Sequence, residues 1–304
     1  MDMQVINLSN LNLLGLKPKF MVFPDSEFKV VLDQIPKDDT YVIVVQTDDS
    51  PAQKVLATGM LLDLVRQHSP SRVVVVHPWL SFSRQDKRFL GGEPLSILML
   101  LDFYSALGAT DLVAFDIHSV QWREPGLYEQ KTSSGYMRIH NLNYVSSFYK
   151  EGYRILSPTG EDEPFLKPLR EQGVQISYFK KEKYCKNCGK PLQECLCEGD
   201  VDKDVRIRSD EDFTGQKLLV VDDIIAGGGT MLSTVRQLVE AGASHIEVAA
   251  THGFFNDLKK ANEILNTAAR VAVSNTVSVP VDLEEKISVQ DITPILEAYV
   301  KTLD

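Results

Sequence analysis

The chain has 304 residues, of which 43% are hydrophobic and 24% are charged, a balance typical of a folded globular protein with a large buried core. Its 32 basic and 42 acidic residues give a net charge of −10, which argues against nucleic-acid and anionic-membrane partners. No apolar run reaches the roughly 18 residues that a membrane helix needs, and no basic start followed by an apolar core opens the chain. We therefore expect a cytoplasmic protein.

Apolar runs and helical patterns alternate along the first half of the chain. Predicted strands occupy residues 41–46, 72–77 and 111–116, and predicted helices occupy residues 53–68 and 94–107. The strands are nearly continuous runs of Val, Ile and Leu, which is typical of parallel strands that are buried on both faces.

The second half repeats this alternation. Predicted strands occupy residues 153–156, 174–179, 218–221, 245–250 and 270–273, and predicted helices occupy residues 163–172, 231–241, 257–266 and 291–303. Strands joined by helices indicate an α/β fold, in which helices cover both faces of parallel sheets. We expect the boundary between the two halves near residues 144–151.

One segment carries the strongest functional signal. Asp222 and Asp223 follow a predicted strand, and residues 227–230 read Gly-Gly-Gly-Thr at the start of a predicted helix. A glycine turn lets backbone N–H groups close on a phosphate, and the helix N-terminus adds a favourable dipole. The two carboxylates suit ribose hydroxyls or a magnesium ion. The loop matches neither the Walker A nor the dinucleotide pattern. We predict a sugar-phosphate site, and the alternative is an ordinary turn with surface acids.

Four segments together resemble those of ribose-phosphate diphosphokinases, also called phosphoribosyl-diphosphate (PRPP) synthetases. Residues 222–230 resemble the PRPP loop that this family shares with type I phosphoribosyltransferases. Residues 81–94, which read SFSRQDKRFLGGEP, resemble an ATP segment that the transferases lack. Residues 116–121 resemble the family's Asp-Leu-His-Ser-x-Gln, and residues 23–27 resemble its Phe-Ser-Asp-Gly-Glu. The resemblance extends over nearly the whole chain.

The resemblance implies two tandem type I phosphoribosyltransferase-like domains, at residues 1–147 and 148–304. It implies transfer of diphosphate from ATP to the C1 hydroxyl of ribose 5-phosphate, giving PRPP and AMP. A magnesium ion would accompany ATP, and the protein would be a homo-oligomer, a dimer or a hexamer, in which one subunit completes the ATP site of the next. The implied site residues are Phe23, Asp25, Glu27, Arg84, Gln85 and Asp86 for ATP; His118 for magnesium and catalysis; Lys181 and Lys183 for catalysis; and Asp222, Asp223, Ala226, Gly227, Gly228, Gly229 and Thr230 for ribose 5-phosphate.

Several positions depart from the family pattern. The family's Ser-Pro-Asp segment ends in Thr159 here, and Glu161 and Asp162 lie two or three residues away from the lost aspartate. Residues 226–230 read Ala-Gly-Gly-Gly-Thr where the family has Asp-Thr-x-Gly-Thr, so the loop from Ala226 lacks the first threonine hydroxyl and the acid before it. Lys183 stands where an arginine is usual. The alternatives are the same chemistry on another sugar phosphate and a non-catalytic regulatory homologue. The plainer interpretation of the basic segments is a solvated loop, and that of a single histidine is a structural role.

All four cysteines fall in a short insertion at residues 185–197, as Cys185, Cys188, Cys195 and Cys197. Cys-x2-Cys with a glycine just after it, followed by Cys-x-Cys, is typical of a zinc knuckle. Disulfides are disfavoured in the cytosol, although disulfides, a redox switch and an iron–sulfur cluster remain the alternatives. The insertion begins two residues after the predicted catalytic lysines. We therefore hypothesise that zinc stiffens the catalytic loop implied by the resemblance.

Overall fold

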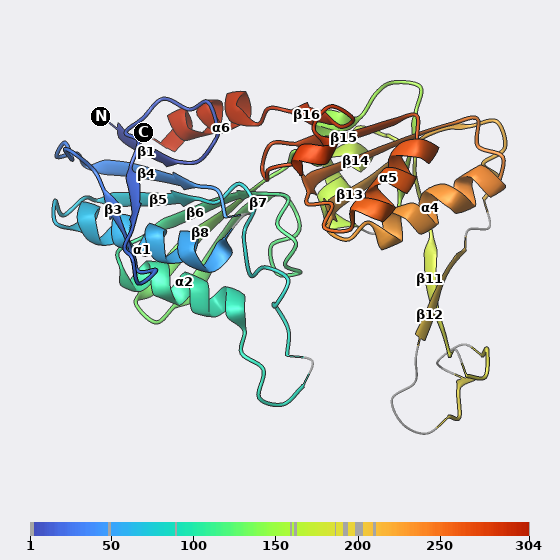
Figure 1. Cartoon of the computed structure of the whole chain (residues 1–304), viewed down its shortest axis with the longest axis horizontal. Coiled ribbons are helices and arrows are strands. Elements are labelled where there is room, and N and C mark those ends of the chain that lie inside the picture. Colours follow the sequence, from blue (N-terminus) through green and yellow to red (C-terminus); the bar gives the residue numbers. More distant parts are fainter. Residues whose placement is uncertain are drawn as a thin grey trace.

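Two six-stranded sheets, one from each half of the chain, form the framework of the computed structural model. The structure describes residues 3–47, 50–88, 90–158, 160, 163–185, 187–190, 194–197, 203–208 and 211–303. Figure 1 shows the two halves as neighbouring lobes, with the last helix returning from the second lobe to the first. The predicted α/β fold with parallel sheets is confirmed, because parallel pairing dominates both sheets.

The first sheet has the strand order β1-β4-β5-β6-β8-β7. Its elements are β1 (Met3–Leu8), β4 (Thr40–Val45), β5 (Arg72–Val76), β6 (Asp111–Phe115), β7 (Gly126–Thr132) and β8 (Gly135–Leu142), with helices α1 (Pro51–Arg66) and α2 (Ser96–Ala106). Every residue of β4 and β6 is buried, as expected for central strands. The edge strand β7 pairs antiparallel with β8, so this sheet is mixed rather than wholly parallel.

The second sheet has the strand order β10-β9-β13-β14-β15-β16, and all of its pairs are parallel. Its strands are β9 (Arg154–Ser157), β10 (Ile176–Tyr178), β13 (Lys217–Ile225), β14 (His245–Gly253), β15 (Arg270–Ser274) and β16 (Ser288–Gln290). The helices of the second half of the chain are α3 (Lys167–Glu171), α4 (Gly229–Glu240), α5 (Leu258–Thr267) and α6 (Thr293–Val300). The chain reverses its direction of travel across the sheet between β9 and β13.

Two hairpins form separate two-stranded sheets. One consists of β2 (Lys19–Val22) and β3 (Phe28–Val31), and the other consists of β11 (Lys180–Cys185) and β12 (Lys203–Arg208). The second hairpin projects from the lobe that contains β13 and α4 (Figure 1). It connects β10 to β13, so it belongs to the crossover between the two sides of the second sheet.

Alternate residues of the strands enter different cores. In β5, Val73 and Val75 join a cluster with α1 and α2, whereas Val74 and Val76 join a second cluster that contains residues of both halves of the chain. This split follows from the two-residue period of a strand. The shared cluster includes Leu296 from α6, so burial of apolar surface holds the C-terminal helix against the first half.

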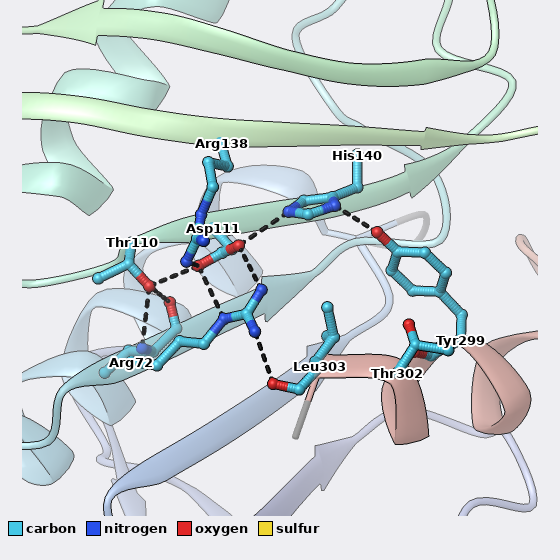
Figure 2. A network of polar contacts seen from close by, with 9 residues as sticks. Arg72, Thr110, Asp111, Arg138, His140, Tyr299, Thr302 and Leu303 are labelled. Atoms are coloured by element: carbon cyan, nitrogen blue, oxygen red, sulfur yellow. Dashed lines mark hydrogen bonds and ion pairs between the residues drawn. The ribbon is translucent and has the colours of Figure 1, made fainter.

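A buried polar network reinforces the same contact (Figure 2). Asp111, at the start of β6, is completely buried and accepts hydrogen bonds from Thr110, Arg72, Arg138 and His140. Burial opposes ionisation of Asp111, but these donors hold its pKa far below the ordinary value. Two members of the network then reach the C-terminal segment, since Arg72 Nη1 donates to the Leu303 carbonyl at 2.6 Å and His140 bonds to Tyr299.

Some element bounds differ from those predicted. β13 continues through Asp222 and Asp223 to Ile225 instead of ending before them, because pairing with β14 persists as far as Ile225 and Gly253. The predicted helix at residues 163–172 opens as a 3-10 turn (Pro164–Leu166) before α3. The chain passes from the first sheet to the second between Leu142 and Arg154, and the domain limits at residues 147 and 148 stay a prediction.

Candidate active site

A cavity of about 280 Å³ opens at the carboxyl end of β13. Three separate segments of the chain line it, and the lining residues are Arg84, His118, Arg123 and residues 222–231. The reversal of strand order between β9 and β13 explains its position, since ligands of open α/β sheets bind at such switch points. The structure thus brings together most of the residues that the sequence nominated for sugar-phosphate and magnesium binding.

The two acids of the cavity have different partners. The Asp223 side chain is only 2% exposed, and its Oδ2 lies 2.6 Å from His118 Nδ1. Its other oxygen lies 3.7 Å from Arg123 Nη2. The Asp222 carboxylate accepts a hydrogen bond from the backbone N–H of Asp223 at 3.0 Å. One acid is therefore contacted by two side chains, His118 and Arg123, and the other is held mainly by the backbone.

These environments separate the acidities of the pair. Burial alone would raise the pKa of Asp223, but the hydrogen bond and charge of His118, together with the charge of Arg123, lower it to about 2. Burial and the adjacent charge of Asp223 raise the pKa of Asp222 well above its ordinary value. Two buried carboxylates this close disfavour simultaneous ionisation, and a bound cation would relieve that cost.

The glycine loop joins β13 to α4. Gly228 has φ of 73° and caps α4, a left-handed conformation that glycine adopts without steric cost. A Cβ at Gly227 or Gly229 would meet no other atom within 4 Å. The space beside the backbone of these two residues is therefore open to a ligand. The first N–H groups of α4 have no intrahelical acceptor and carry partial positive charge. The loop and the helix start can therefore cradle an anion.

A strained turn presents His118. Asp116 is completely buried with φ of 36°, an uncommon value for a residue other than glycine. Its carboxylate accepts hydrogen bonds from the backbone N–H groups of Tyr144 and Val145 and from Thr251 Oγ1 of the second sheet. Burial raises the pKa of Asp116 to about 6, although these bonds oppose the rise. The turn before His118 is thus fixed by donors from both halves of the chain.

The predicted ATP segment lies beside this turn. Arg84 lines the cavity. Gln85 instead contacts the Lys87 carbonyl and Glu93. Asp86 accepts a hydrogen bond from the Val120 N–H at 2.7 Å, so it ties the segment to the turn that carries His118. In the structure Asp86 therefore has a positioning contact, whereas contact of Gln85 and Asp86 with ATP stays a prediction.

Other predicted residues lie away from the cavity or outside the described atoms. Phe23, Asp25 and Glu27 occupy the exposed turn between β2 and β3, and Figure 1 shows β3 on the far side of the first lobe from β13. Lys181 and Lys183 belong to β11, and their side chains fall outside the described part of the structure. The departures at Thr159, Glu161 and Asp162 also lie outside the described residues.

Sequence reasoning missed an ion pair at the rim of the acid pair. Arg123 Nη1 lies 2.9 Å from Glu163 Oε2, and both side chains are largely buried. The guanidinium also stacks on the Phe165 ring at 5.3 Å. A basic residue soon after the turn that follows β6 was the available signal for Arg123, because that turn reaches the carboxyl edge of the first sheet.

The donor chemistry fits two different metals at two places. Asp222 and Asp223 offer carboxylate oxygens beside His118, and magnesium takes oxygen ligands. In a separate segment, the sulfur atoms of Cys185, Cys188, Cys195 and Cys197 all lie within 4.8 Å of one another, a group that could hold a metal ion.

None of the helices in the described part of the chain combines the length and apolar character needed to cross a membrane.

Comparisons with known proteins agree with this geometry. The N-terminal domain of ribose phosphate pyrophosphokinase matches residues 5–108, and the phosphoribosyl transferase domain matches residues 169–286. The ribose-phosphate pyrophosphokinase of Pyrococcus furiosus is 32% identical over 272 residues, which cover 88% of this chain and 87% of the relative. That of Pyrococcus abyssi is 30% identical over 290 residues, which cover 92% of this chain and 89% of the relative.

A solved structure shares the whole fold. The phosphoribosylpyrophosphate synthetase of Mycobacterium smegmatis superposes with a TM-score of 0.75 at 20% identity, and the match covers 100% of this chain and 99% of that chain. The two domain matches, the relatives and the cavity lined by segments of both halves of the chain lead to one conclusion. The chain belongs to the ribose-phosphate pyrophosphokinase, or PRPP synthetase, family of enzymes.

Proposed function

We propose that the protein transfers the diphosphoryl group of ATP to the C1 hydroxyl of ribose 5-phosphate, giving PRPP and AMP. The observation that carries this proposal is the cavity in which the acid pair, His118 and the open glycine loop meet. Such a site offers ligands for sugar hydroxyls, for a phosphate and for a magnesium ion at the same time. Membership of the family supports the choice of reaction.

The glycine loop would hold the 5-phosphate of the acceptor. Gly227 and Gly229 leave the backbone accessible, Gly228 supplies the left-handed turn between them, and the positive end of α4 favours a doubly charged phosphate. Thr230 adds a hydroxyl at the first turn of the helix. Asp222 and Asp223 would then accept hydrogen bonds from the ribose hydroxyls, which fixes the sugar at the carboxyl end of β13.

Positive groups that line the same cavity would receive the ATP phosphates. Arg84 and Arg123 both line the cavity, and a guanidinium can bind two phosphate oxygens at once. Lys181 and Lys183 would supply further positive charge from β11. In a homo-oligomer, Phe23, Asp25 and Glu27 of a neighbouring subunit would complete the nucleotide site, which accounts for their exposed position in the single chain.

The proposed cofactors are Mg²⁺ in the cavity and a structural Zn²⁺ at the four cysteines. Because Nδ1 of His118 is bound to Asp223, Nε2 is the ring nitrogen that would face the magnesium. The acid pair offers the oxygen ligands that this ion prefers. When bound, magnesium supplies positive charge against the phosphates of ATP.

The reaction needs positioning and charge stabilisation rather than a covalent intermediate. The C1 hydroxyl oxygen attacks the β-phosphorus in line. The bond from that phosphorus to the oxygen shared with the α-phosphate breaks, AMP leaves with the electron pair, and the hydroxyl proton is released to solvent. Donors and cations preorganised around the transferred group lower the barrier, because they need no reorganisation as charge shifts.

A panel of acceptors tests the proposed substrate. We expect Mg-ATP-dependent AMP release with ribose 5-phosphate, and none with 1,4-anhydroribitol 5-phosphate, which keeps the furanose ring but lacks the attacking hydroxyl. Ribose without its phosphate should react poorly because it cannot use the glycine loop. Faster AMP release with another sugar phosphate would identify that compound as the preferred acceptor in place of ribose 5-phosphate. No release with any acceptor, while ATP still binds, would favour a regulatory homologue.

A further inference from the structure

The four cysteines lie at the end of the β11–β12 hairpin that is farthest from the sheets. All six residues of β11 pair with β12, and Cys185 is the last of them, opposite Lys203. The other three cysteines follow in the connection between the two strands. The cluster therefore occurs where the hairpin ladder stops and the chain turns back.

The sulfur geometry discriminates between the chemical states of the cluster. Sγ of Cys185 lies 3.8 Å from that of Cys197, and Sγ of Cys188 lies 3.6 Å from that of Cys195. A tetrahedral zinc with Zn–S bonds of about 2.3 Å places its sulfur atoms about 3.8 Å apart. A disulfide requires about 2.0 Å. The observed separations agree with four ligands of one ion and not with two bonded pairs.

The backbone around the sulfurs is shaped for thiolates. The N–H of Cys188 donates to Sγ of Cys185, and the N–H of Cys197 donates to Sγ of Cys195, each at 3.4 Å. Gly189 has φ of 70° and donates to the Cys185 carbonyl at 2.7 Å, which forms the tight turn after the first pair. Donors directed at ligand sulfurs stabilise their negative charge and orient them toward a metal.

This part of the chain has little apolar packing to hold it. Among the described residues, none between Phe179 and Phe213 belongs to the hydrophobic clusters of the protein. Leu196, between the last two cysteines, is 92% exposed. A short segment without an apolar core requires another source of stability, and a structural metal supplies it because metal binding and folding are coupled.

We infer that Cys185, Cys188, Cys195 and Cys197 bind one Zn²⁺ as thiolates, and that this ion fastens the end of the β11–β12 hairpin. Lys181 and Lys183 lie four and two residues before Cys185 on the same strand. Zinc occupancy therefore controls how firmly these two lysines are held for diphosphoryl transfer, and this consequence rests on the proposed function. The metal site itself does not depend on it.

Metal content tests the site directly. We expect about one zinc per chain by elemental mass spectrometry of protein purified without added metal, and less than a tenth of that in Cys188→Ser and Cys195→Ser. Leu196→Ser is the matched control, because it changes the same turn without removing a ligand, and it should keep its zinc. Cobalt substitution should give the intense visible absorption of a tetrahedral thiolate site. Four reactive thiols with no metal after incubation with zinc, or the absorption of an iron–sulfur cluster, would overturn the assignment.

A second experiment tests whether zinc stabilises the β11–β12 hairpin. Chelation should increase the rate of tryptic cleavage between residues 180 and 208 at least tenfold, and readdition of zinc should reverse the change. On the proposed function, the same treatment should lower kcat for AMP release at least tenfold while ATP binding persists. Unchanged cleavage and unchanged kcat after complete zinc removal would refute the fastening role. Zinc-loaded protein that releases no AMP would instead count against the proposed function, while its metal content would still establish the site.

Discussion

Replacing Asp111 by asparagine should loosen the contact between the C-terminal helix and the first sheet. The Asp111 carboxylate is completely buried and holds Arg72 and His140, which in turn contact Leu303 and Tyr299 (Figure 2). Asparagine has nearly the same shape but no charge. The substitution therefore leaves cationic groups near the buried position without their counterion.

The expected loss of stability follows from burial. Removing one partner of a buried ion pair costs about 3–5 kcal/mol. Arg138 reduces this figure, because its side chain is 43% exposed and regains water when the pair is broken. The asparagine oxygen also keeps one acceptor. We expect Asp111→Asn to lower the free energy of unfolding by about 2–4 kcal/mol, which corresponds to a fall of roughly 3–6 °C in Tm for a protein of this size.

Urea denaturation and hydrogen exchange measure the two parts of this prediction. Amides of α6 and of the 3-10 turn Lys301–Leu303 should exchange faster in the variant than those of β14, which lies outside the network. Asp63→Asn is the control, since the Asp63–Arg66 pair is about half exposed and should contribute less than about 0.5 kcal/mol. Equal stability of the two variants would refute the reasoning that the buried carboxylate anchors the C-terminal segment.

Three further predictions concern protonation, the phosphate loop and a strained turn. Burial lowers the pKa of His77 to about 4. Below pH 6.5 the histidine is therefore protonated in the unfolded chain but stays neutral in the folded protein until the pH approaches 4. The contribution of this histidine to stability is complete above pH 6.5 and decreases as the pH falls below 6.5. In urea denaturation, the stability advantage of wild type over His77→Gln should therefore shrink by about 2 kcal/mol between pH 7.5 and pH 5. Gly227→Ala should leave Tm within about 1 °C but raise KM for the sugar phosphate at least tenfold, because its methyl group enters the open side of the cradle; an unchanged KM would contradict the assigned phosphate site. Ser26 has φ of 72°, so Ser26→Gly should stabilise the protein by about 0.5–1 kcal/mol in thermal denaturation, whereas Ser26→Ala should give no gain.

The central strands and their helices could be predicted because their signals are local. Runs such as residues 41–45 and 73–76 are apolar throughout and form strands buried on both faces. β7 and β8 were missed because their sequences, GLYEQKT and GYMRIHNL, contain many polar residues and form the edge of a sheet. The return of α6 to the first half depends on contacts with distant residues, which no local pattern shows.

The candidate site was predicted to the extent that its residues form motifs. Asp222, Asp223 and the glycine loop are contiguous, so their spacing alone indicates a phosphate cradle. The Arg123–Glu163 pair joins residues forty positions apart, and only the packing of the turn after β6 against the start of the 3-10 turn before α3 brings them together. The contact between Asp86 and Val120 has the same origin.

Phosphorus NMR of the complete reaction would decide the proposed activity. Zinc-loaded protein would be incubated with Mg-ATP and ribose 5-phosphate, and the phosphorus signals of AMP and PRPP would be followed together. We predict that both products appear in equal amounts and that neither appears when ribose 5-phosphate is omitted. Formation of ADP in place of AMP, or AMP accompanied by free diphosphate and no PRPP, would contradict transfer of the diphosphoryl group to the sugar.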